Sequence, residues 1–98
     1  MMENYYDLEP SQAFKKALVA LDSVGFTVET SDEDNGKIVA SSGASLASWG
    51  EEIDIDIIKA EAKTKVCVSS TSKAQLFAWG KNEKNEKRFL QEFEKIIG

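Results

Sequence analysis

Residues 51–59 read EEIDIDIIK, and isoleucine alternates with acidic residues through most of this stretch. Because successive side chains of a β-strand point to opposite faces, the isoleucines line one face and the acidic side chains line the other. Such alternation is typical of a sheet that buries one face and exposes the other to water. This stretch therefore predicts a half-buried strand and decides the fold class.

The segment after it predicts a partner strand. Residues 64–71 also alternate, and Val66 lies on their apolar face, as the isoleucines do in residues 51–59. An antiparallel pairing of Ile57 with Val66 would bury the isoleucines and valines of both strands together. The same register sets Asp56 opposite Cys67 on the other face of the sheet.

The segment before it predicts a β-hairpin. Residues 26–30 and 37–41 alternate as strands on either side of a polar turn. The Asn-Gly pair at 35–36 supplies the positive φ angles that a tight hairpin needs. The register of the hairpin decides which side chains of the second strand are buried. The alternatives are Val39, or Ile38 with Ala40, and we favour the second.

Two helices flank these strands. Pro10 suits the first turn of a helix over residues 10–24, and Gly25 suits the left-handed position that follows a helix end. A second helix is expected over residues 82–97, where apolar side chains recur at helical spacing. The apolar faces consist of Phe14, Ala17, Leu18, Leu21 and Val24 in the first helix and of Phe89, Leu90, Phe93, Ile96 and Ile97 in the second.

The order of these elements predicts the architecture. A helix, four strands and a helix follow one another along the chain, which indicates an α+β fold. One-sided strands and amphipathic helices favour a two-layer sandwich, in which a four-stranded antiparallel sheet carries both helices on one face. With 98 residues, the chain is expected to form a single domain over residues 1–98.

The composition argues against several classes of function. A net charge of −5 disfavours nucleic-acid binding, which needs a basic surface. The chain has no histidine, the commonest metal ligand and acid–base residue, so neither a metal nor a cofactor is expected. No apolar run is long enough to span a membrane, no signal peptide is recognisable, and Cys67 has no disulfide partner. We therefore expect a cytoplasmic protein.

The candidates for catalysis lie on the polar face of the sheet. Asp54 and Asp56 are two residues apart, and two close carboxylates could bind a cation or divide acid and base roles. The alternative, which we favour, is a solvated outer face balanced by Lys65. Cys67 has no histidine to lower its pKa and an acidic neighbour that raises it, so we expect an inert thiol. No catalytic residue is predicted.

The candidate binding site is built around two Trp-Gly pairs. Trp49 follows a loop of small residues, while Trp79 and Gly80 precede the second helix. Exposed indoles would form a surface for a peptide or ligand, and the free N–H groups at the helix start would bind an anion. The alternative is that both rings pack in the core. The candidate contact residues are Trp49, Trp79, Gly80, Lys81, Asn82 and Asn85.

Four motifs are spread along the chain. They are Gly25-Phe26-x-Val28, Asp34-x-Gly36-x-Ile38-x-Ala40, Ser48-Trp49-Gly50-Glu51 and Trp79-Gly80-Lys81-Asn82-x-x-Asn85. Together they resemble a family of small uncharacterised bacterial domains, and the last motif is the most specific. That family has an acidic residue where this chain has Ala78, and it has no established activity to carry over. The order of elements is also similar to the helix-grip modules of bacterial envelope lipoproteins.

These observations predict a small domain without enzymatic activity that serves as a protein-interaction or structural module. Free sheet edges would allow a protein partner or a second copy of the chain to bind. The alternative is a small-ligand or anion-binding domain that uses the Trp49 loop and the helix start at Gly80-Lys81.

Overall fold

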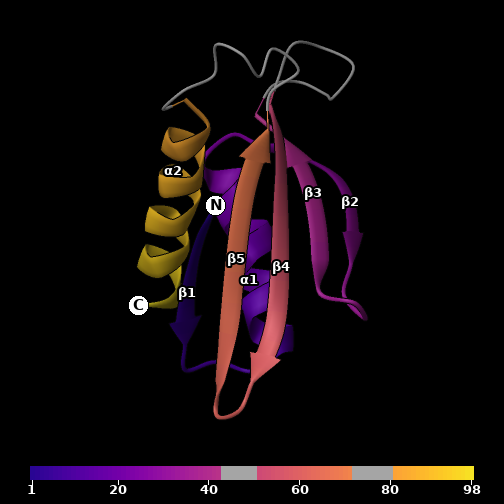
Figure 1. Cartoon of the computed structure of the whole chain (residues 1–98), viewed down its shortest axis with the longest axis vertical. Helices are drawn as coiled ribbons and strands as arrows, with labels where there is room; N and C mark the ends of the chain where they lie inside the picture. The colour runs from indigo at the N-terminus through magenta and orange to yellow at the C-terminus, as the bar shows by residue number, and fades with distance from the viewer. Residues whose placement is uncertain (43–50, 72–80) are drawn as a thin grey trace.

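The fold consists of strands and helices arranged as drawn in Figure 1. A computed structural model describes residues 1–42, 51–71 and 81–98, apart from the side chains of residues 81–83. The elements are β1 (Met2–Tyr6), α1 (Pro10–Ser23), β2 (Thr27–Asp32), β3 (Lys37–Ser41), β4 (Glu52–Ala60), β5 (Lys63–Thr71) and α2 (Lys81–Ile97). Neither helix in these ranges is long and apolar enough to cross a membrane.

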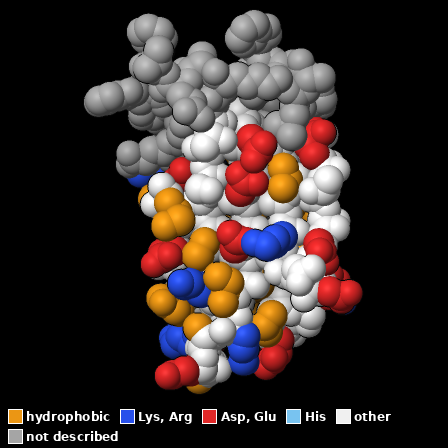
Figure 2. Space-filling model, turned by 45° about the vertical axis from the view of Figure 1, so that its right-hand side comes forward, with side chains coloured by type: hydrophobic (Ala, Val, Ile, Leu, Met, Phe, Trp, Pro, Cys, Tyr) orange, Lys and Arg blue, Asp and Glu red, His pale blue; other side chains and the backbone are white. Residues whose placement is uncertain are grey.

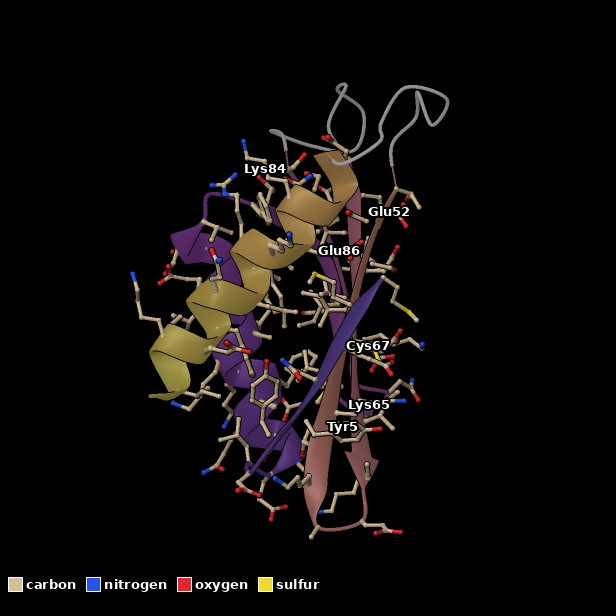
Figure 3. The ribbon with its side chains drawn as sticks, turned by 60° about the vertical axis from the view of Figure 1, so that its left-hand side comes forward. Tyr5, Glu52, Lys65, Cys67, Lys84 and Glu86 are labelled. Carbon is tan, nitrogen blue, oxygen red and sulfur yellow. The ribbon has the colours of Figure 1, made fainter. Side chains whose placement is uncertain are left out.

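The strands form one antiparallel sheet in the order β1-β5-β4-β3-β2. Both helices lie on the same side of it, to the left of the sheet in Figure 3, and the fold is α+β. The prediction of four strands is wrong, because the sheet has five. The additional strand, β1, pairs with β5, where Asn4 lies opposite Val66. Its sequence does not alternate between apolar and polar residues, so pairing with a distant segment makes it a strand.

The β4–β5 hairpin has the predicted register. Ile57 lies opposite Val66, and both side chains are buried on the helix side of the sheet. Asp56 lies opposite Cys67 on the other side. The long alternating stretch therefore forms the centre of the sheet, as its pattern indicates.

The β2–β3 hairpin confirms the favoured buried side but not the predicted turn. Ile38 and Ala40 are buried. Only Gly36 has a positive φ in this turn, of 65°. Asn35 instead donates hydrogen bonds to the Asp32 carboxylate from its backbone N–H at 3.3 Å and from its side-chain amide at 2.7 Å. Residues 33–36 separate the strands, and a loop of this length does not need two left-handed residues.

Helix α1 begins and ends at the expected signals. Pro10 is its first residue, and Gly25 follows the helix end with a φ of 82°. Arg88 of α2 crosses to this end and donates a hydrogen bond to the carbonyl oxygen of Val24 at 3.0 Å. The guanidinium of Arg88 also lies 5.4 Å from the ring centroid of Phe26. These contacts tie the two helices together.

Aromatic rings attach α2 to β1. Phe89 and Phe93 are fully buried, with ring centroids 5.8 Å apart. Tyr6 of β1 packs edge-on against Phe93 at 5.0 Å, and its hydroxyl donates to the Glu94 carboxylate at 2.7 Å. Burial, and then the hydrogen bond to Glu94, raise the pKa of Tyr6 above its ordinary value. The strand missed by sequence reasoning is therefore fixed by contacts with the last helix.

Candidate functional site

Most of the predicted contact residues lie outside the part that the structure describes. Trp49, Trp79 and Gly80 belong to the ranges that are not described. Lys81 and Asn82 form the first turn of α2, but their side chains are not described either. The described residues therefore do not test whether the site predicted around the two Trp-Gly pairs forms.

Asn85 is the one predicted contact whose side chain is described. It lies on α2, is 7% exposed, and its Nδ2 has no acceptor among the described residues. The next residue, Glu86, is also buried and points toward the sheet (Figure 3). Its carboxylate accepts hydrogen bonds from the backbone N–H of Ser70 at 3.0 Å and from the Ser70 hydroxyl at 3.4 Å. Buried polar groups thus occupy the end of the core near the start of α2.

The side of the sheet opposite the helices is a second candidate, and we call it the open face. No helix of the described ranges covers it (Figures 1 and 3). Figure 2 shows acidic side chains gathered in its upper part and hydrophobic ones in its lower part. It includes Glu3 and Tyr5 on β1, Lys65, Cys67 and Ser69 on β5, Glu52, Asp54, Asp56 and Ile58 on β4, Lys37 and Val39 on β3, and Thr30 and Asp32 on β2.

Two carboxyl groups interact directly in the upper part of the open face. Glu52 and Asp54 share a side-chain hydrogen bond. Burial, then this hydrogen bond and the charge of Glu52, raise the pKa of Asp54 to about 6. No lysine or arginine among the described residues forms an ion pair with either group, whereas Asp56 pairs with the ammonium of Lys37 at 2.8 Å. Glu52 and Asp54 therefore lack a direct ion pair, and only the charge of Lys37, which is paired with Asp56, partly offsets that of Asp54.

Lys65 does not balance the aspartates in the way the sequence analysis expected. Its ammonium lies 3.9 Å from the carboxylate of Glu3 on β1, a strand that was not predicted. The same carboxylate of Glu3 accepts a hydrogen bond from the thiol of Cys67 at 3.5 Å. Burial, and then this hydrogen bond, raise the pKa of Cys67, and such a thiol is a poor nucleophile.

The described residues do not form a metal centre. No group of three or more His, Cys, Asp or Glu side chains within them could hold a metal ion. Asp54 and Asp56 therefore lack the further ligands that a cation such as Ca²⁺ takes. The chemistry that the open face offers is attraction of positively charged groups.

Replacing Asp54 by asparagine is expected to stabilise the protein near pH 7.5 and to have little effect near pH 4. The pKa of Asp54 rises from 3.8 to about 6 on folding, so the folded state binds this proton more tightly. Asp54 therefore stabilises the folded state below pH 3.8, and this contribution is lost as the pH rises through about 6. After allowance for solvent screening, we expect a gain of about 1 kcal/mol near pH 7.5.

Urea unfolding at both pH values measures this effect. The exposed Asp34 in the β2–β3 turn is the matched control, because Asp34→Asn removes the same charge away from the pair. An equal gain from Asp54→Asn at both pH values would show that the proton is not bound more tightly in the folded state.

The comparisons with family models and with curated proteins found no match. The resemblance to small bacterial domains therefore stays a prediction.

The predicted site residues do not include Glu52, Ile58 or Tyr5 of the open face. Glu52 and Ile58 belong to the alternation of β4, so the strand pattern already places them beside Asp54 and Asp56. Tyr5 joins them only because β1 pairs with β5, and no local pattern signals that contact.

Proposed function

We propose that this protein is a non-enzymatic interaction domain whose open face binds a partner protein through basic side chains. The observation that carries the proposal is a negatively charged face, covered by neither described helix, on a sheet whose other face is packed against both of them. A half-covered antiparallel sheet is stable in water, so its free face is available for binding.

The charges of the open face determine the chemistry of the partner. Both lysines on this face already lie beside a carboxylate, at 2.8 and 3.9 Å. Glu52 and Asp54 have no such neighbour within the described ranges. Lysine or arginine side chains of a partner would supply the missing positive charge and would lower the pKa of Asp54 again.

The stability of the free protein supports the same conclusion. Two hydrogen-bonded carboxyl groups disfavour each other's ionised form, so this arrangement costs stability at neutral pH. Surfaces that are kept at a cost to stability are commonly used for function. A basic partner would convert this repulsion into attraction.

The β2 edge of the sheet is less suited to binding than the open face. The outer strand β2 has an irregular register between Val28 and Thr30, where Glu29 forms a bulge against β3. Bulges and charged residues discourage the addition of another strand at an edge. A partner on the open face is therefore favoured over self-association through this edge. Light scattering across protein concentrations distinguishes them, because edge pairing requires a dimer.

A non-enzymatic role fits the available side chains. The chain has no histidine, and the pKa of Cys67 is raised. The Cys67 thiol does donate to the Glu3 carboxylate, but this hydrogen bond raises the thiol pKa and so does not activate it as a nucleophile.

Fluorescein-labelled hexalysine provides a defined basic probe. We expect its fluorescence anisotropy to rise on titration with the protein, and the affinity to fall as salt screens the charges. Labelled hexaglutamate should not bind. No binding of hexalysine at low salt, or binding that is indifferent to salt, would contradict the proposal.

The orphaned amide of Asn85 favours a second candidate function, the binding of a small ligand or anion at the start of α2. Its buried Nδ2 has no described acceptor, and a ligand oxygen would satisfy it in the favourable field of a helix N-terminus. Trp79 lies just before this helix and would report binding. Titration with inorganic phosphate should change tryptophan fluorescence, and the change should be lost in Asn85→Ala. A flat response of the unmodified protein would exclude this candidate for phosphate.

A further inference from the structure

The lower part of the open face carries an exposed apolar row across three strands. Lys65 of β5 lies opposite Tyr5 on one side and opposite Ile58 on the other. Tyr5 is 52% exposed and Ile58 is 44% exposed. Figure 3 shows Tyr5 and Lys65 on the side of the sheet away from the helices. Since neighbouring strands are about 4.8 Å apart, the row is about 10 Å wide, with the Lys65 methylenes at its centre.

The apolar row and the acidic pair lie at a defined separation. Ile58 and Asp54 are four residues apart on β4, which corresponds to about 13 Å along the strand. Between them, Asp56 is neutralised by Lys37 at 2.8 Å. The open face thus has an apolar end and an acidic end, with a neutralised segment between them.

An α-helix is the segment that can use both ends at once. The backbone groups of β3, β4 and β5 already pair within the sheet. An extended segment laid on the face would leave its own backbone groups without partners, whereas a helix satisfies them internally. The midpoint of Glu52 and Asp54 lies five strand residues from Ile58, a distance of about 17 Å. This distance equals about eleven residues of helix, or three turns, so one side of a helix can reach both ends.

We propose that the partner presents an α-helix with an apolar side chain at one position and basic side chains about eleven residues away on the same side of the helix. The apolar side chain packs between Tyr5 and Ile58, and the basic side chains contact Glu52 and Asp54. This inference rests on the proposed function and specifies the shape and chemistry of the partner. Hexalysine tests only the charge, so the helix requires probes of its own.

Two blocked alanine–glutamine helical peptides of equal composition test the spacing. In the first, a leucine lies about eleven residues, or three turns, from a pair of lysines on the same helix face. In the second, the leucine lies within one turn of the lysines. We expect the first to bind about tenfold more tightly, because only its leucine reaches the apolar row while the lysines contact the acidic pair.

Substitutions connect that difference to the apolar row. Ile58→Ser should remove the difference and leave the affinity of the second peptide unchanged. Val19→Ser, at another exposed apolar residue on α1, is the matched control and should preserve the difference. Equal affinities of the two peptides, with hexalysine still bound, would overturn the helix and leave the proposed function standing. Failure of both peptides and of hexalysine would overturn both.

Discussion

Replacing Gly36 by alanine is expected to lower the free energy of unfolding by about 3 kcal/mol. Gly36 has a φ of 65°, a conformation that costs other residues about 1 kcal/mol. A Cβ at this position would also overlap the carbonyl oxygen of Ile57 on β4. Relief of the overlap requires the turn to move away from β4, which breaks the 2.7 Å hydrogen bond from the Ile57 N–H to the Gly36 carbonyl. Urea unfolding followed by circular dichroism measures the loss.

Gly25 provides the matched control for this substitution. It also has a positive φ, of 82°, but a Cβ there would meet no atom within 4 Å. Gly25→Ala should therefore cost only the backbone strain, about 1 kcal/mol. Equal losses at the two glycines would contradict the account of how the β2–β3 turn packs on β4.

Reversing the charges of Glu52 and Asp54 together is expected to weaken hexalysine binding at least about tenfold. The variant Glu52→Lys with Asp54→Lys removes the two carboxylates that lack an ion pair and replaces them with groups that repel the probe. The neutral variant Glu52→Gln with Asp54→Asn should bind with intermediate affinity, and its stability near pH 7.5 should not fall. Anisotropy titrations at low and physiological salt measure both effects.

The β2–β3 turn supplies a control with the same change in net charge. Glu33 and Asp34 are exposed in this turn, which lies at the opposite end of β3 from Ser41, the residue that pairs with Glu52. Glu33→Lys with Asp34→Lys should weaken hexalysine binding less than about threefold, because exposed charges at a distance are screened by salt. If this variant lost as much affinity as the open-face variant, the probe would be responding to net charge and not to a site.

The centre of the sheet could be predicted because its signals are local. The alternation of β4 and the short connection to β5 determine which side chains face inward and which residues lie opposite one another. β1 has no such signal. Its place depends on Tyr6, which packs on Phe93 and donates to Glu94 from the other end of the chain. Contacts of this kind leave no periodic pattern in the segment that they order.

The charge balance of the open face depends on a register that the sequence leaves open. Lys37 lies opposite Asp56, and Val39 lies opposite Asp54. A shift of two residues would keep the same side chains buried and would place Lys37 opposite Asp54 instead. Gly36 packs against Ile57 directly beside the pair formed by Lys37 and Asp56, and this contact fixes the observed register. The acidic pair therefore emerges only when the turn and the strands are considered together.

The most direct test of the open face as the binding surface is a map of amide chemical shifts during titration of ¹⁵N-labelled protein with hexalysine. We expect the largest changes in β3 and in β4 between Glu52 and Asp56, with α1 and α2 nearly unchanged. These changes should saturate together and shrink as salt is added. Changes concentrated in the β2–β3 turn or on the helices, with β4 unaffected, would contradict the assignment of the open face as the site of binding.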